Sequence, residues 1–371
     1  MIIGTPRERK TLEKRVALTP DGAKELTSRG HTVLIEKDAG IGSGFGNDLY
    51  ESAGCQMVDT LEDVWTRSEL VVKVKEPHES EYQFFRPGLA IFDYLHLASM
   101  PELAAKLVET KITGIAFELV RSSDGRYPLL DPMSEVAGKL SVLNGANLLL
   151  SQNNGRGVLL AGTSTIPARR VTIIGAGVAG QAACEAALGM GARVTLLDNN
   201  VDKLHNIKVR FGNAPRTVFS TPQSIAIEAA KADLLIGAVL IPGAHAPRLI
   251  TRETMSRMKP NSVFVDISID QGGCAETIRP TNLDNPAYLE EGVLHYGVCN
   301  MPAQVPRTST MALSLVTLPY VIQLADKGIV KAMQENQSLK DALNTCNGKL
   351  TNKAVSGAVN IDYTPIDEVL K

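Results

Sequence analysis

Apolar and polar positions along the first third of the chain predict short strands separated by helices. Apolar runs predict strands at residues 1–6, 31–36, 70–77, 89–97 and 114–120. A helix is expected from Thr19, which caps its amino end, to Gly30, which ends it, with Pro20 in the first turn. Further helices are expected over 61–68 and 100–111. This alternation is typical of parallel sheets with helices on both faces.

The same alternation returns in a second block, from residue 171 to about 300. A long helical pattern over 132–152 precedes this block, and another over 308–328 (TSTMALSLVTLPYVIQLADKG) follows it. A chain of 371 residues is long enough for two domains of about 100–200 residues each. We therefore expect an α/β protein with two doubly wound, Rossmann-like domains. One domain, residues 131–308, is inserted into a discontinuous domain formed by residues 1–130 and 309–371.

Composition and charge narrow the class of protein. Hydrophobic residues make up 44% and charged residues 21% of the chain, and the formal net charge is −2, which gives no basic surface for nucleic acid or an anionic membrane. The amino terminus lacks the apolar core of a signal peptide, and long apolar stretches such as ADLLIGAVLIPGA are short and interrupted by Gly and Pro. Five scattered cysteines show no paired or metal-binding spacing, which favours reduced thiols in a cytosol. We expect neither a nucleic-acid nor a membrane partner, and no metal site is predicted.

A glycine-rich turn is the clearest local signal. In VTIIGAGVAGQAACEAALGMGARVTLLD, a strand runs into Gly175, Gly177 and Gly180 with G-x-G-x-x-G spacing, and a helix and a second strand follow. The glycines allow a tight turn, close approach of a pyrophosphate and helix–strand packing. The second strand ends at Asp198, where a ribose-binding carboxylate is expected, and its charge favours NAD over NADP. The alternative is that Asp198 only caps the next turn.

Four polar residues lie at or near predicted strand ends, where parallel sheets bind ligands. Lys75 ends VVKVK, His96 ends IFDYLHL, Asp270 ends SVFVDISID, and Arg15 follows the first strand. If the carboxyl edges of the two sheets face one cleft, these four side chains meet beside the nicotinamide. Each has a structural alternative: a surface charge for Arg15, a solvated strand face shared with Lys73 for Lys75, a core position for His96, and a turn cap for Asp270.

Over essentially its whole length, the chain resembles the alanine dehydrogenases. The resemblance rests on GTPRERKTLEKRVALTP, VVKVKEP, YLHLA, PLLDPMSEVAGKL, IGAGVAG, IGAVLIPGAHAP, VFVDISIDQGG and NMPAQVPRTST. The wider fold group includes the NAD-binding subunit of proton-pumping transhydrogenases and the saccharopine dehydrogenases. The combination of Lys75, His96 and IDQGG is specific to the alanine enzymes. Connecting stretches such as NNGRGVLLAGTST depart from the family, whereas the proposed catalytic positions do not.

The resemblance implies a role for each part of the chain. Residues 1–130 and 309–371 would form the substrate domain, and residues 131–308 the NAD-binding domain. Arg15 and Lys75 would hold the substrate carboxylate, His96 would be the general acid/base, and Asp270 the second catalytic residue. Together with the three glycines, the implied NAD-binding set is Ser134, Val178, Ala179, Asp198, Lys203, Ser220, Val239, Leu240, Ile267, Ser268, Ile269, Asp270, Arg279, Val298, Cys299, Asn300 and Met301.

The implied activity is NAD-dependent, reversible oxidative deamination of L-alanine to pyruvate and ammonium, by a cytoplasmic homohexamer. Its proton transfers near neutral pH suit imidazole, with an ordinary pKa of about 6.5, so His96 is interpreted as catalytic. The other histidines, at 31, 78, 205, 245 and 295, are interpreted as structural or solvated. Alternatives are another amino acid as substrate, hydride transfer between nucleotides, or a catalytically silent NAD-binding protein that senses redox state.

Overall fold

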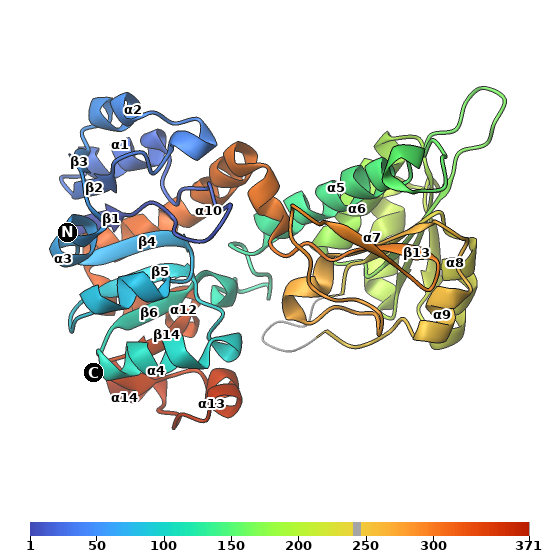
Figure 1. Cartoon of the computed structure of the whole chain (residues 1–371). Coiled ribbons are helices and arrows are strands. Elements are labelled where there is room, and N and C mark those ends of the chain that lie inside the picture. Colours follow the sequence, from blue (N-terminus) through green and yellow to red (C-terminus); the bar gives the residue numbers. More distant parts are fainter. Residues whose placement is uncertain (240–245, 371) are drawn as a thin grey trace. The chain divides into compact units, whose positions relative to one another are not determined.

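The computed structural model describes residues 1–239 and 246–370, and the chain divides into two compact units (Figure 1). Unit 1 consists of Met1–Met133 and Ala303–Lys371, and unit 2 of Ser134–Pro302. Each unit has one sheet in which most neighbouring strands are parallel. The expected α/β class, with one Rossmann-like unit inserted into another, is therefore confirmed. The substrate and NAD-binding roles given to the two segments stay predictions.

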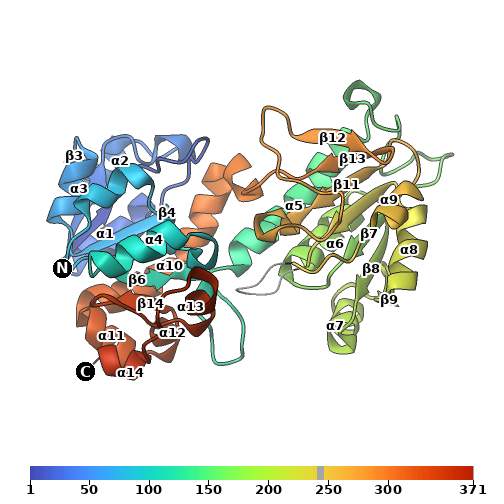
Figure 2. The ribbon, with the colours of Figure 1, turned by 60° about the horizontal axis from the view of Figure 1, so that its bottom comes forward.

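Unit 1 is built on an eight-stranded sheet with the order β15-β14-β6-β5-β4-β1-β2-β3. Its parallel strands are β1 (Ile2–Thr5), β2 (Thr32–Glu36), β3 (Gln56–Val58), β4 (Leu70–Lys75), β5 (Ala90–Tyr94) and β6 (Thr113–Ala116). The C-terminal segment adds two antiparallel strands, β14 (Leu343–Cys346) and β15 (Lys349–Leu350). Figures 1 and 2 show this segment, in red, beside β6. The five predicted strands are present, whereas β3, β14 and β15 were missed.

The helices of unit 1 are α1 (Pro20–Ser28), α2 (Asn47–Ser52), α3 (Leu61–Arg67), α4 (Pro101–Glu109), α10 (Pro306–Lys327), α11 (Ile329–Glu335), α12 (Gln337–Asp341), α13 (Lys353–Val359) and α14 (Ile366–Val369). The helices α1, α3, α4 and α10 were predicted, whereas α2 and α11–α14 were not. The Thr19 side chain caps α1 by accepting the Gly22 N–H at 3.2 Å, as predicted. Trp65 of α3 and Leu103 and Leu107 of α4 are fully buried in one apolar cluster with residues of β4 and β5.

Helix α10 joins the C-terminal segment to the amino-terminal part of unit 1. The Val16 N–H donates to Thr310 Oγ1 at 3.1 Å, and the Thr19 N–H donates to Ser314 Oγ at 3.3 Å. Over 22 residues with a mean hydropathy of 1.3, α10 is long and apolar enough to cross a membrane by length and composition alone. The sequence predicted a helix over 308–328 but was not interpreted there as a possible membrane span. In the structure 44% of the 18-residue window is buried.

Unit 2 has a seven-stranded sheet with the order β12-β13-β11-β10-β7-β8-β9. Its strands are β7 (Arg170–Ile174), β8 (Arg193–Asp198), β9 (Arg216–Phe219), β10 (Leu234–Gly237), β11 (Val263–Asp266), β12 (Ala287–Glu290) and β13 (Val293–Tyr296), of which only β12 is antiparallel to its neighbour. The chain starts at β7, goes outward to β8 and β9, and returns on the other side with β10. The strand order therefore reverses between β7 and β10, the position where such sheets bind ligands.

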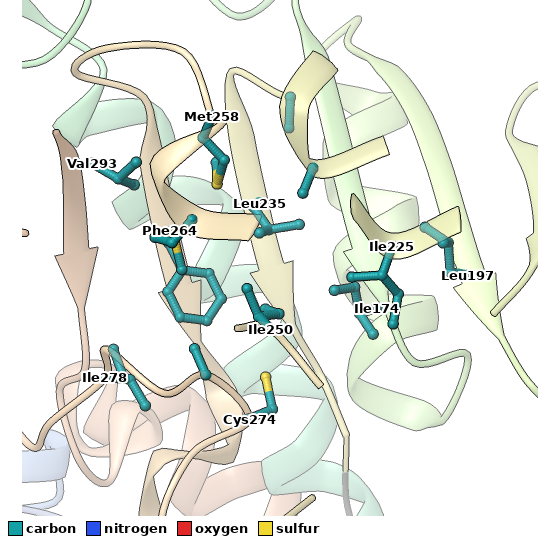
Figure 3. Close-up of a cluster of buried hydrophobic side chains, with 14 of the residues drawn as sticks. Ile174, Leu197, Ile225, Leu235, Ile250, Met258, Phe264, Cys274, Ile278 and Val293 are labelled. Atoms are coloured by element: carbon teal, nitrogen blue, oxygen red, sulfur yellow. The ribbon is translucent and has the colours of Figure 1, made fainter. Parts of the chain in front are cut away.

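The helices of unit 2 are α5 (Asp131–Leu148), which begins in unit 1, α6 (Val178–Gly189), α7 (Val201–Phe211), α8 (Pro222–Lys231) and α9 (Arg252–Ser256). Figure 3 shows the apolar cluster that holds α8 and α9 against the sheet. Phe264 of β11 and Leu235 of β10 are fully buried there, and Ile225 of α8 belongs to the same cluster, beside Ile174 of β7 in Figure 3. This core fixes the strands whose carboxyl ends carry the candidate site.

Candidate active site

The glycine turn of unit 2 has the geometry that its spacing predicts. Gly175 has φ +107°, and a Cβ there would lie 2.2 Å from the carbonyl oxygen of Ala238. A Cβ on Gly180 would lie 1.8 Å from the Gly175 carbonyl oxygen, so these two positions exclude any side chain. A Cβ on Gly177 would meet no described atom within 4 Å. The backbone at Gly177 is therefore open to a ligand, at the amino end of α6.

Asp198 connects the glycine turn to the end of β8. Its carboxylate is 8% exposed, and Oδ2 accepts the Ala176 N–H at 2.7 Å while Oδ1 accepts the Asn200 N–H at 2.8 Å. Asn200 is the residue that caps α7, by accepting the N–H groups of Asp202 and Lys203. A carboxylate has about four acceptor positions, so two remain for ribose hydroxyls.

Other residues of the predicted NAD-binding set meet at neighbouring strand ends. The Val239 N–H, after β10, donates to Ser268 Oγ at 3.1 Å. Ser268 lies in a 3-10 turn, η6 (Ile267–Gln271), directly after β11. In the same turn the Asp270 carboxylate accepts the Asn300 N–H, at 3.1 and 3.3 Å from its two oxygens. The carboxyl ends of β10, β11 and β13 are thus tied together. Leu240 lies outside the described residues.

A buried carboxylate organises the turn that carries Asp270. Asp266, at the end of β11, is fully buried, and its two oxygens accept the Ser268 N–H at 2.9 Å and the Cys274 N–H at 2.7 Å. Asp270 itself makes its contact across to Asn300, which has φ +56°. The turn is capped by Asp266. Asp270 is therefore not needed as the cap of this turn, which was its structural alternative.

Of the remaining predicted NAD-binding residues, Ser220 is joined to Asp198, because its N–H donates to the Asp198 carbonyl oxygen at 2.9 Å. Val178 and Ala179 open α6, Lys203 lies in the first turn of α7, and Ser220 follows β9. Arg279 stacks on Tyr288, with its guanidinium carbon 4.0 Å from the ring centroid. Ser134 starts unit 2, and Val298, Cys299 and Met301 follow β13. Their role toward a dinucleotide stays a prediction.

In unit 1, Arg15 is a buried residue. It is 2% exposed, so the interpretation as a surface charge is wrong. Its Nε and Nη2 donate to the Glu13 carboxylate at 2.7 and 2.5 Å, and Nη1 lies 3.2 Å from the Met133 sulfur. A buried guanidinium with one carboxylate partner is held rigidly, which suits a second planar carboxylate as ligand.

Lys73 and Lys75 do not share a solvated face, because β4 is irregular between Val72 and Lys75. Lys73 is 1% exposed, and its Nζ lies 3.0 Å from Glu81 and 3.3 Å from Glu8. Lys75 lies at the strand end, partly exposed, with Nζ 3.6 Å from Glu76. Between the pairs Val72–Phe92 and Lys75–Tyr94, two residues of β4 lie opposite one residue of β5, so the simple alternation is lost. The interpretation of both lysines as solvated is therefore wrong for Lys73.

The segment after β1 holds the end of β4 in place. Glu8 Oε1 accepts the Val74 N–H at 2.7 Å and the Lys75 N–H at 3.4 Å. Lys10 forms an ion pair with Glu76. Although burial raises the pKa of Glu76, the ammonium groups of Lys75 and Lys10 bring that pKa below its ordinary value. Lys75 is thus fixed beside an ionised carboxylate.

His96 is not a core histidine. Its side chain is 40% exposed, and it stacks on Tyr94 with ring centroids 5.8 Å apart and an interplanar angle of 5°. Its backbone has φ +48°, and its N–H donates to Glu118 Oε1 at 2.7 Å. Partial burial and the Lys75 ammonium lower the pKa of His96 to about 3. The imidazole is therefore neutral, and able to accept a proton, near neutral pH.

The sequence reading missed the carboxylates that hold these residues. Glu8, Glu13 and Glu118 contact Lys75, Arg15 and His96 respectively. One of them had a signal: Glu118 is the only charged residue in the apolar stretch 112–120. A lone charge at the end of a buried strand needs a partner, and in the structure that partner is His96.

Comparison with known proteins adds to this geometry. Residues 4–137 match the alanine dehydrogenase/PNT N-terminal domain, and residues 141–353 match the alanine dehydrogenase/PNT C-terminal domain. The chain belongs to the alanine dehydrogenase/PNT family. It is 51% identical over 373 residues to the alanine dehydrogenase of Bacillus subtilis, with 100% of this chain and 98% of the relative covered. It is 47% identical over 371 residues to the alanine dehydrogenase of Methanococcus maripaludis, with both chains fully covered.

Solved structures give the same result. An L-alanine dehydrogenase superposes with a TM-score of 0.93 at 44% identity, over 97% of this chain and 99% of the other. A transhydrogenase from Sinorhizobium meliloti superposes with a TM-score of 0.80 at 25% identity, over 95% of this chain and 100% of the other. The family resemblance predicted from the sequence is confirmed, with the alanine dehydrogenase as the more similar of these two structures.

Proposed function

We propose that this chain catalyses the reversible, NAD-dependent oxidative deamination of L-alanine to pyruvate and ammonium. The observation that carries the proposal is the 51% identity to an alanine dehydrogenase along the entire chain. The strand ends of the two units carry the residue types that this reaction needs: cations for a carboxylate, a neutral imidazole, and a glycine turn for a dinucleotide.

The residues at the glycine turn fit a dinucleotide. The open space beside Gly177 accommodates a pyrophosphate, and the amino end of α6 offers backbone N–H groups with no side-chain cap. Asp198 would accept the adenosine ribose hydroxyls. When bound, the nicotinamide accepts a hydride from the α-carbon of alanine. The charge of Asp198 supports NAD over NADP.

Arg15 and Lys75 would bind the substrate carboxylate through charge-assisted hydrogen bonds and so orient the α-carbon. Loss of the hydride yields iminopyruvate, to which water adds before ammonia leaves. Neutral His96 would take the proton of the attacking water and return it to the leaving nitrogen. Asp270, ordered by its contact with Asn300, would be the second catalytic residue.

The experiment that tests this function uses the purified chain with NAD⁺ and a panel of amino acids, while NADH absorbance is followed. L-Alanine should be the best substrate, and pyruvate with ammonium and NADH should react in reverse. Turnover of lysine or saccharopine without alanine would overturn the proposal. So would hydride exchange between nucleotides without any amino acid, which the similarity to a transhydrogenase makes the second candidate.

The assembly is proposed to be a cytoplasmic homohexamer with no membrane partner. Helix α10 supports an oligomer, because Met311 and Leu315 are 47% and 74% exposed four residues apart on one helix face. Light scattering of the purified chain without detergent tests the hexamer by its mass. It also tests the absence of a membrane partner, since a membrane helix would require detergent for solubility.

A further inference from the structure

Glu118 and His96 lie at adjacent strand ends in unit 1. Glu118 is in the 3-10 turn η4 (Phe117–Leu119) directly after β6, and His96 comes two residues after the end of β5. β5 and β6 are parallel neighbours, with Asp93 opposite Ala116. The sheet order alone thus brings the carboxylate to the histidine, although 22 residues separate them in the chain.

We propose that Glu118 is the positioning residue of His96: its carboxylate holds the backbone of His96 and engages Nδ1, so that Nε2 is the atom that exchanges protons with the substrate. The proposal rests on the proposed alanine dehydrogenase function. It concerns a residue that neither contacts the dinucleotide turn nor belongs to the predicted catalytic set.

The first argument is the backbone of His96. With φ +48° and ψ 35° it adopts the left-handed conformation, which is uncommon for residues other than glycine and persists where the surroundings impose it. In this conformation the His96 N–H donates to Glu118 Oε1 at 2.7 Å, a contact that holds the strained backbone. Stacking on Tyr94 then fixes the plane of the imidazole.

The second argument is the imidazole itself. Nδ1 lies 3.8 Å from Glu118 Oε1, beyond a hydrogen bond but within reach of an ion pair. Hydrogen bonds of catalytic groups are often long before the substrate binds. When His96 takes up a proton, the imidazolium has the Glu118 carboxyl beside Nδ1, and Nε2 remains available for proton exchange with the substrate.

The third argument is the second carboxylate oxygen. Glu118 Oε2 is buried and has no hydrogen-bond partner among the described residues. Oε2 is therefore available to carry a proton while Oε1 accepts the His96 N–H.

The surroundings of Glu118 agree with that role. Burial raises the pKa of Glu118 to about 7. The N–H groups of His96 and Leu95 and the ammonium of Lys75 lower this pKa, but their effect is smaller than that of burial. From β5, the carboxyl of Asp93 and the hydroxyl of Tyr94 also face Glu118. Glu118 therefore gains or loses its proton in the range where the proposed reaction runs.

The test compares Glu118→Gln with Glu118→Asp and with a matched control, Asp93→Asn. The control also replaces a buried carboxyl with an amide, on the neighbouring strand β5, but Asp93 makes no hydrogen bond to His96. Glu118→Gln should lower kcat at least about tenfold, less than the loss of about 10²–10⁴-fold that removal of a general base itself causes. The KM for alanine and the Kd for NADH should stay within about twofold, because carboxylate and coenzyme are held elsewhere.

The pH profile separates a positioning role from a structural one. In the wild type, titration of Glu118 should make kcat/KM change with pH around pH 7. This pH dependence should disappear in Glu118→Gln, persist with a shifted midpoint in Glu118→Asp, and be unchanged in Asp93→Asn. Wild-type kcat and pH profile in Glu118→Gln would overturn the proposal. If wild-type protein oxidises no alanine at all, the proposed function has failed instead, and that outcome is visible before any variant is made.

A spectroscopic measurement covers the case in which the glutamine variant does not fold. In wild-type protein with ¹⁵N-labelled histidine, at a pH well above 7, Nδ1 of His96 should carry the proton and Nε2 should be unprotonated. The resonances are assigned with a His96→Gln sample. The opposite tautomer, with Nδ1 unprotonated beside an ionised Glu118, would overturn the proposal.

Discussion

The carboxylate of Asp198 accepts the backbone N–H of Ala176 at 2.7 Å, so the acidic residue that ends β8 also holds the glycine turn after β7. The same carboxylate accepts the Asn200 N–H on its other oxygen. Asp198 therefore fixes the loop that would surround a pyrophosphate and, in the proposed function, also binds the ribose. Its replacement has two separable consequences.

Asp198→Ala should weaken NAD binding and improve the use of NADP. The ribose hydroxyls lose an acceptor, and the 2′-phosphate no longer meets a like charge, whose repulsion costs several kcal/mol. Lys203, in the first turn of α7, can then approach the phosphate. The measurement is kcat/KM with both coenzymes in wild type and variant, and an unaltered NAD/NADP ratio would refute the ribose role.

The same variant should also lose stability, by about 1.5–3 kcal/mol for each hydrogen bond to a charged group. Asp198→Asn is the matched control, because its amide oxygen can still accept one of the two N–H groups while the negative charge is gone. The coenzyme ratio should therefore change in both variants, whereas the loss in thermal unfolding temperature should be smaller for Asn.

His96→Ala should lower turnover about 10²–10⁴-fold, the usual contribution of a general acid/base group. NADH binding, measured by fluorescence titration, should remain, because the glycine turn belongs to the other unit. Since the pKa of His96 is lowered to about 3, no loss of wild-type activity between pH 6.5 and 4 should follow from protonation of this imidazole. Near-native kinetics in the variant would make His96 a structural residue.

The parts of the fold that were predictable have strong local patterns. The glycine turn and the buried strand β5 were predicted because apolar runs and glycine spacing are properties of contiguous residues. The strands β3, β14 and β15 were missed because they are short, and β14, although buried, contains Asn344 and Thr345 in place of an apolar run.

The site was predictable only in its strand-end residues. The positions of His96 and Lys75 follow from the rule for parallel sheets, but their partners follow from strand order, which local periodicity does not contain. Glu118 meets His96 only because β6 pairs with β5. The irregularity in β4 likewise separates Lys73 from Lys75, and no feature of VVKVK indicates it.

Lys75→Ala should raise the KM for pyruvate and lower turnover, with little loss of stability. Its Nζ is the proposed partner of the substrate carboxylate, and its contact with Glu76 at 3.6 Å is shared with Lys10. Steady-state kinetics in the reductive direction measure the effect. A KM unchanged from the wild type would exclude Lys75 from substrate binding.

Lys73→Met is the contrasting variant, two positions earlier in β4. Removing this buried ammonium leaves Glu8 and Glu81 without their cation, which should cost about 3–5 kcal/mol of stability. Urea unfolding measures the loss, and Lys106→Met, at an exposed ion pair of α4, is the matched surface control with an expected change below about 1 kcal/mol. Equal stability of the two variants would contradict the buried cluster.

Asp93 gives a prediction for the pH dependence of stability. It is fully buried on β5, neither oxygen has a hydrogen-bond partner among the described residues, and burial raises its pKa well above 3.8 in spite of Lys73. The unfolded chain releases this proton at about pH 3.9, whereas the folded chain retains it. The unfolded state is therefore favoured increasingly as pH rises from about 4 to the folded pKa, and this group makes the protein less stable at neutral pH than in mild acid.

Asp93→Asn has the same shape and does not titrate, so its free energy of unfolding at pH 7 should equal or exceed that of the wild type, and the difference should shrink toward pH 4. Urea unfolding across this range measures both trends. A variant that is less stable than wild type at neutral pH would mean that Asp93 is ionised in the folded protein and paired with Lys73.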